Sequence, residues 1–147
     1  MQNMSALDLA LQYMQIFYSG KELDRLSSIL HADLKFRGPL FQFDTAWEYI
    51  ASIKADPPVA CSYRILHTFE KENVVNLLYD FYKPGITTTM SQLFEVRNDK
   101  IIRIVLIFDS AVFAKKEWNS EIFQSWWYVY NIRFRKCGFE KLRAGKW

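Results

Sequence analysis

The segment that most constrains the fold is residues 86–110, ITTTMSQLFEVRNDKIIRIVLIFDS. Two runs rich in β-branched and apolar residues lie on either side of the polar pair Asn98-Asp99. A polar pair between two strand-forming runs is typical of a β-hairpin. We therefore predict two antiparallel strands joined by a tight turn at Asn98-Asp99.

Side chains alternate between the two faces of a strand, which assigns these residues to rows. In the first strand the amide Gln92 shares a face with three apolar residues, Met90, Phe94 and Val96. The rows of the second strand are Val105, Ile107 and Asp109 on one face and Ile102, Ile104, Leu106 and Phe108 on the other. Both rows are apolar until Asp109, so we expect both faces of this strand to be covered. We predict that the row ending in Asp109 faces inward.

The residues before this hairpin predict three helices. Apolar residues recur at helical spacing over residues 4–18, and Ser5 with Asp8 resembles a capping box. A short second helix is expected from Leu23 to near His31, because its leucines and isoleucines keep the same period. Asp44 or Thr45 can cap a third helix, which carries the apolar residues Trp47, Ile50 and Ile53, and Glu48 completes a capping box with Thr45.

Strands dominate the sequence after the third helix. Residues 61–71 and 74–83 have strand composition and are separated by a turn, and a further turn at Pro84-Gly85 leads into the hairpin. A short strand is also expected at residues 33–37, before Gly38-Pro39. Helices followed by a meander of strands indicate an α+β domain with its helices on one face of the sheet.

The amino-acid composition limits which kinds of protein this chain can be. The 147 residues suffice for one domain with its own core, and 17% of them are aromatic, so we expect some rings to line a cavity or an interface. Cys61 and Cys137 lie far apart and match no metal or redox spacing, which favours two reduced thiols in an intracellular protein. With two histidines and no ligand cluster, we expect neither a metal nor a cofactor.

No leader sequence opens the chain and no apolar run is long enough to span a membrane, so we expect a cytoplasmic protein. Residues 111–147 hold eight Lys and Arg against three Glu, whereas residues 1–110 carry a net charge of −2. We treat residues 111–147 as a C-terminal extension of a single domain, 1–147.

The extension combines rings with positive charge. A helix that begins at Asn119 or Ser120 would place Ile122, Trp126, Tyr130 and Phe134 on one stripe, although residues 127–130 and 132–135 have strand composition. We predict the helix. Basic, aromatic segments also suit nucleic acid or a membrane surface. Because the rest of the chain is slightly acidic, we instead expect these rings to pack on the protein, with no nucleic-acid or membrane partner.

Two segments, LDRLSSILHADLKFRGPL at residues 23–40 and KIIRIVLIFDS at residues 100–110, resemble the nuclear transport factor 2-like superfamily. This superfamily includes the SnoaL-like polyketide cyclases and the ketosteroid isomerases, and the resemblance covers residues 5–113. It implies a strongly bent antiparallel sheet folded around the N-terminal helices into a cone. It also implies an apolar pocket at the open end and a homodimer through the outer sheet face. The candidate dimer row here is Ile102, Ile104, Leu106 and Phe108.

The same resemblance suggests site residues. The ketosteroid isomerases place their proton-shuttling Asp just before the Pro that follows the first strand, and Gly38 occupies that position here, so we do not expect that reaction. Their oxyanion-hole positions correspond to Tyr13 and Gln92, both of which can donate a hydrogen bond. Asp109 remains as the candidate base, or alternatively as a cap of the turn at Ser110.

The remaining candidates would bind a ligand. His67 shares a strand face with Tyr63, Ile65 and Phe69, and it is either an acid/base partner or a structural histidine. The candidate ligand-binding residues are His67, Met90, Phe94, Ile107 and Tyr63.

These residues predict a protein of the SnoaL-like kind with a pocket for an apolar small molecule. It is a candidate for proton transfer in an isomerisation, cyclisation or hydration, with Asp109 as the base and with Tyr13 and Gln92 stabilising negative charge. The alternative is a non-catalytic module that binds a ligand or a protein through the same fold.

Overall fold

The computed structural model describes residues 3–114 of the chain. Contacts divide the chain into two units, Met1–Ser110 and Ala111–Trp147. In the second unit the structure describes one short helix, α4 (Ala111–Ala114). The helix predicted from residue 119 or 120, its aromatic stripe and Cys137 lie outside the described residues. Within residues 3–114, no helix has the length and hydropathy needed to cross a bilayer.

The first helix, α1 (Ala6–Ser19), begins as its sequence predicts. The Ser5 hydroxyl accepts a hydrogen bond from the Asp8 N–H (3.1 Å), and the Asp8 carboxylate accepts one from the Ser5 N–H (3.0 Å). This reciprocal capping box satisfies two N–H groups that the helix itself leaves unpaired. At the other end Gly20 adopts a left-handed conformation (φ +65°), and its N–H donates to the Phe17 carbonyl (3.2 Å).

The second helical segment is shorter than the sequence predicts. It consists of a 3₁₀ turn, η1 (Leu23–Arg25), and one turn of α-helix, α2 (Leu26–Ile29). The chain then extends directly into β1 (Leu30–Arg37), three residues earlier than expected. Leu30 pairs with Ile101 in the sheet and is only 3% exposed, so the sheet uses a residue that the periodicity assigned to the helix.

The third helix, α3 (Ala46–Ala55), starts at Thr45, whose hydroxyl accepts a hydrogen bond from the Glu48 N–H (3.2 Å). Its buried residues are Ala46, Tyr49 and Ile53. Trp47, on the same helix, is 78% exposed. The core side of α3 is therefore built around a tyrosine rather than around its tryptophan.

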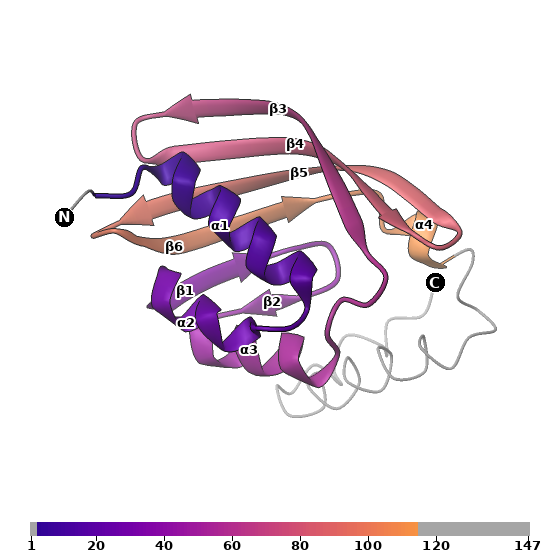
Figure 1. Ribbon diagram of the computed structural model, residues 1–147, viewed down its shortest axis with the longest axis horizontal. Helices are drawn as coiled ribbons and strands as arrows, with labels where there is room; N and C mark the ends of the chain where they lie inside the picture. Colours follow the sequence, from indigo (N-terminus) through magenta and orange to yellow (C-terminus); the bar gives the residue numbers. More distant parts are fainter. Residues whose placement is uncertain (1–2, 115–147) are drawn as a thin grey trace, which may run out of the picture. The chain divides into compact units, whose positions relative to one another are not determined.

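Six strands form one sheet, in the order β2-β1-β6-β5-β4-β3. The remaining strands are β2 (Gln42–Phe43), β3 (Ser62–Lys71), β4 (Val74–Lys83), β5 (Ile86–Arg97) and β6 (Lys100–Ile107). The four longest match the predicted runs closely. The sheet is mixed rather than wholly antiparallel, because β1 pairs parallel with β6. Helix α1 lies across β3 to β6, and α3 packs on β1 and β2 (Figure 1).

The predicted hairpin is present, but the faces of its second strand are exchanged. Asn98 and Asp99 both have positive φ, as a two-residue turn between strands requires. Opposite residues of an antiparallel pair share a face, and Gln92 lies opposite Leu106. Leu106 therefore faces inward, whereas Ile107 faces outward and is 62% exposed.

The row that the sequence assigned to a dimer interface consequently contributes to the core. Ile104 lies opposite Phe94, and both are fully buried. The prediction was wrong because both rows of β6 are apolar, so hydrophobicity could not decide between them. The register of β5 with β6 also shifts between Glu95 and Val96, so the residues next to the turn pair in a different register from the rest of the two strands.

Candidate functional site

Five buried or half-buried polar side chains meet between the helices and the inner face of the sheet. We call this group the tyrosine cluster, and its members are Tyr13, Tyr18, Tyr49, Tyr79 and Gln92. Gln92 is only 3% exposed, although its side chain is an amide. Burying an amide costs free energy unless it is hydrogen-bonded, so its partners explain why it is tolerated there.

Hydrogen bonds connect the cluster across four elements. The hydroxyls of Tyr13 on α1 and Tyr49 on α3 are hydrogen-bonded to each other. Tyr79 on β4 donates to Oε1 of Gln92 on β5 (2.8 Å), and Tyr18, near the end of α1, donates to the Tyr79 hydroxyl (3.5 Å). Each buried hydroxyl thus has a partner, whereas one without a partner would cost about 1 to 3 kcal/mol.

Local structure explains how these side chains come together. Tyr13 follows Leu9 by four residues, so both lie on the inner side of α1. Tyr79 alternates with Leu77 and Phe81 in the buried row of β4. Gln92 lies opposite Leu77, so Tyr79 reaches it diagonally across the strand pair.

Apolar rings surround the cluster. Phe94 meets Tyr13 edge to face, with ring centroids 5.1 Å apart, and Phe36 stacks on Tyr49 at 4.7 Å. At the other side of the cluster, Tyr63 packs on Tyr18 at 4.7 Å. The hydroxyl and amide groups consequently lie in surroundings of low polarity, where hydrogen bonds and charges interact strongly.

Burial also determines the protonation of the phenols. It raises the pKa of Tyr13 to about 12, although hydrogen bonds from Tyr49 and Gln92 counteract part of this rise. Burial likewise raises the pKa of Tyr18, Tyr49 and Tyr79. These phenols stay neutral near pH 7, so they act as hydrogen-bond donors and not as bases.

Most of the predicted site residues gather around this cluster. Tyr13 and Gln92 are members, and Met90 and Phe94 are buried next to them. The Met90 sulfur lies 3.6 Å from the Tyr79 hydroxyl. Tyr63 is half-buried at the edge, with its ring 6.3 Å from that of Tyr79.

His67 does not lie with them, and a β-bulge is the reason. Ile65 pairs with Tyr79, but after the bulge His67 pairs with Leu78. Ile65 therefore faces inward, whereas His67 is exposed on the outer face with Phe69. The expected alternation from Tyr63 to His67 was wrong because one extra residue, Leu66, reverses the faces.

Asp109 and Ile107 are also away from the cluster. Asp109 follows the end of β6 and is exposed, and Ile107 faces outward. The inward position predicted for both was wrong because Leu106, the residue between Val105 and Ile107, is the one opposite Gln92. The phenols and the amide are thus brought together without the carboxylate that was expected to act with them.

Sequence reasoning missed Tyr18, Tyr49 and Tyr79. The available signal was their position in apolar rows, such as Val75, Leu77, Tyr79 and Phe81 along β4. A tyrosine in a buried row needs a partner for its hydroxyl, which would have linked Tyr79 to the amide predicted on the neighbouring strand. Within residues 3–114, His, Cys, Asp and Glu form no group of three that could hold a metal ion.

The sequence matches no protein-family model and no curated protein. Solved structures nevertheless share its fold. A nuclear transport factor 2 (NTF2)-like protein of unknown function from Cytophaga hutchinsonii is 20% identical, with a TM-score of 0.67, and the match covers 77% of this chain and 97% of that one. An LEH-like epoxide hydrolase from M. tuberculosis is 14% identical, with a TM-score of 0.62, over 75% of this chain and 86% of its own.

A candidate ketosteroid isomerase from Kribbella flavida is also similar, at 11% identity and a TM-score of 0.63, over 71% of this chain and 77% of its own. At these identities the comparison establishes the fold alone. The chain has the α+β fold of the NTF2-like proteins, as the resemblance in residues 23–40 and 100–110 implied.

Proposed function

We propose that this chain, with its NTF2-like fold, binds an apolar small molecule whose oxygen accepts hydrogen bonds from the tyrosine cluster. The observation that carries the proposal is the meeting of the Tyr13 hydroxyl and the Gln92 amide in an apolar interior. Small-molecule sites typically combine apolar walls with a few such convergent polar groups. Structures with this fold include an epoxide hydrolase and a candidate ketosteroid isomerase, which supports a small organic ligand.

The hydroxyls of Tyr13 and Tyr49 satisfy each other by their mutual hydrogen bond. A ligand oxygen inserted between them can accept a hydrogen bond from each hydroxyl, so that neither buried hydroxyl is left without a partner. The rings that such a ligand has to displace are those of Tyr18 and Tyr63, which are half-buried and packed on each other.

We put binding ahead of catalysis. A proton-transfer reaction would use Tyr13 and Gln92 to stabilise negative charge, but it also needs a base within hydrogen-bonding distance of the substrate. Asp109 was the candidate base, and it is exposed beyond the end of β6. We therefore propose that the hydrogen-bond donors of the tyrosine cluster bind a ligand and do not catalyse a reaction.

The test compares two ligands that differ in one oxygen. Isothermal titration with 2-acetylnaphthalene, a ketone, is expected to give tighter binding than 2-ethylnaphthalene, which lacks the oxygen. Tyr13→Phe should weaken ketone binding about tenfold, the effect of one hydrogen bond, and leave the hydrocarbon unaffected. Tyr82→Phe is the matched control, since Tyr82 lies outside the cluster and contacts Asp80. Equal binding of both compounds by the unmodified protein would contradict the proposal.

We also propose a homodimer, formed through the outer face of β3 to β6. Phe69 and Ile107 are 58% and 62% exposed on this face. Between them lie the half-buried apolar residues Leu78, Leu93 and Val105. Exposed apolar side chains gathered on one sheet face favour association with a second copy.

A further inference from the structure

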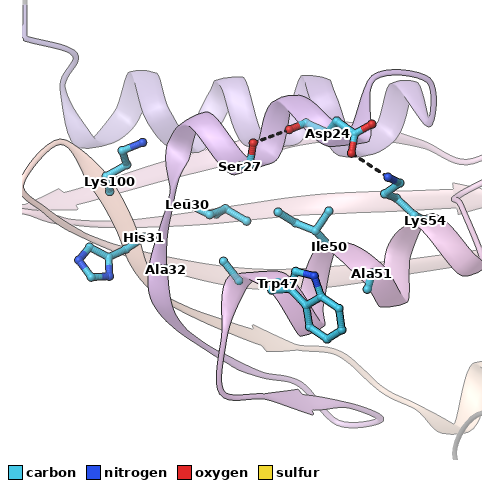
Figure 2. Close-up of a pocket in the computed structure, with 11 residues that line it drawn as sticks. Asp24, Ser27, Leu30, His31, Ala32, Trp47, Ile50, Ala51, Lys54 and Lys100 are labelled. Carbon is cyan, nitrogen blue, oxygen red and sulfur yellow. Dashed lines mark hydrogen bonds and ion pairs between the residues drawn. The ribbon is translucent and has the colours of Figure 1, made fainter.

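A hollow lies outside the tyrosine cluster and shares no residue with it (Figure 2). It is a groove of about 650 Å³ between α3, the junction of α2 with β1, and Lys100 at the start of β6. This volume is within the range of about 300 to 1,000 Å³ that is usual for sites of small organic ligands.

The wall of the groove is apolar and largely made of small side chains. It includes Leu30, Ala32, Ile50 and Ala51. Trp47 lies beside them and is 78% exposed, so most of its indole surface is in contact with water. An exposed tryptophan next to an apolar wall indicates a surface that gains stability when a flat apolar body covers it.

The two ends of the groove differ in charge. At one end the Lys54 ammonium and the Asp24 carboxylate form an ion pair across 2.8 Å, so their charges largely cancel. At the other end Lys100 donates one hydrogen bond to the Ser28 carbonyl (2.6 Å). An ammonium group has three N–H donors, so this contact uses only one of them.

His31 lies at the same end of the groove as Lys100 (Figure 2). These two residues flank the pairing of Leu30 with Ile101, which brings the starts of β1 and β6 together. The Nδ1 atom of His31 accepts a hydrogen bond from the Asp33 N–H (3.0 Å) and lies 4.0 Å from the Asp33 carboxylate. In the neutral ring the proton is therefore on Nε2, and the ring extends away from the apolar wall (Figure 2), which leaves Lys100 as the donor at this end.

We propose that this groove binds a small aromatic carboxylate. The ring lies on the apolar wall beside Trp47, and the carboxylate accepts a hydrogen bond from Lys100 Nζ. Asp24 is neutralised by Lys54, and within residues 3–114 Lys100 forms no ion pair, so its positive charge selects an anion over a cation. This site and its ligand are separate from those of the proposed function.

The experiment uses 2-naphthoate and its neutral counterpart 2-naphthamide, titrated into the full chain by calorimetry. Naphthoate is expected to bind one to one, and the amide about tenfold more weakly because it lacks the charge-assisted hydrogen bond. Lys100→Gln should weaken naphthoate about tenfold while leaving the amide unchanged, and Trp47→Ala should weaken both. Lys71→Gln, at an exposed lysine of β3, is the matched control.

Naphthoate affinity that survives both Lys100→Gln and Trp47→Ala would overturn the proposal, as would equal affinity for the amide. Loss of naphthoate binding in Tyr13→Phe would assign the ligand to the tyrosine cluster instead. Sedimentation that shows a dimer broken by Trp47→Ala would assign the groove to a second copy of the chain and also overturn it. Thermal unfolding of each variant verifies that it is folded.

Discussion

The Tyr79 hydroxyl donates a hydrogen bond to Oε1 of Gln92 across 2.8 Å, from one strand to the next. Because Tyr18 in turn donates to the Tyr79 oxygen, the proton of Tyr79 is directed at Gln92. With its oxygen occupied, the Gln92 amide keeps its N–H groups for Tyr13. The hydrogen bond from Tyr79 thus orients the Gln92 amide, whose N–H groups are donors of the proposed ligand site.

Tyr79→Phe is expected to reduce the free energy of unfolding by about 1 to 3 kcal/mol, because it leaves Gln92 Oε1 buried without that donor. The double variant Tyr79→Phe with Gln92→Leu should lose less than the sum of the single losses, since both polar groups are then gone. Urea denaturation of the unmodified protein, the two single variants and the double variant measures these losses, with Tyr82→Phe as the control. Strictly additive losses would show that the two residues do not interact.

Alkaline pH should destabilise the protein through Tyr13. Its folded pKa of about 12 exceeds the ordinary value of 10.0, so the unfolded chain releases this proton first. Stability falls as pH rises above 10 and this contribution levels off above about 12, with a total loss of about 3 kcal/mol. Tyr13→Phe should make the decline in unfolding free energy with pH less steep. An unchanged slope in the variant would be evidence against the burial of an ionisable Tyr13.

Replacing Gly20 with alanine should lower the free energy of unfolding more than replacing Gly38 with alanine. An added Cβ at Gly20 would lie 2.8 Å from the Pro58 carbonyl oxygen, and the backbone there has φ +65°. We expect Gly20→Ala to cost about 1 to 2 kcal/mol through backbone strain alone. At Gly38 the nearest atom, 3.2 Å away, belongs to the Phe36 ring, so Gly38→Ala is the matched control. Equal unfolding free energies for the two variants would refute this expectation.

Ile107→Asp and Phe69→Asp should convert the proposed dimer into a monomer, because each introduces a charge into the apolar outer face. Sedimentation equilibrium at micromolar concentration measures the change. Val59→Asp is the control, since Val59 is 72% exposed in the loop between α3 and β3. A monomeric unmodified protein, or a dimer that withstands both substitutions, would exclude this interface.

The sequence predicted where helices, strands and turns lie better than it predicted which side chains of a strand face the core. The Asn98-Asp99 turn and the caps at Ser5 and Thr45 are local signals, and all three are present in the structure. The two rows of β6 are equally apolar, so only its register with β5 assigns them, and that register is a long-range property. The bulge at Leu66 has no clear signal in the sequence, and it moved His67 to the outer face.

The candidate site was predicted in part. The resemblance matched Tyr13 and Gln92 to oxyanion-hole positions, and the structure places their side chains in hydrogen-bonding contact. It could not identify Tyr49, because the choice between Tyr49 and Trp47 as the core ring of α3 depends on how the helix is rotated against β1. β2, with two residues, is too short to have a periodicity of its own.

The parallel pairing of β1 with β6 has a consequence for how the chain folds. β3 to β6 are joined by short turns and can pair with neighbours in sequence, but Leu30 finds its partner only in Ile101. Closing such a long loop is entropically costly and slow compared with forming hairpins. During synthesis, the edge of β1 that pairs with β6 therefore stays unpaired until β6 has left the ribosome. We expect this to be the stage at which the chain is most exposed to aggregation.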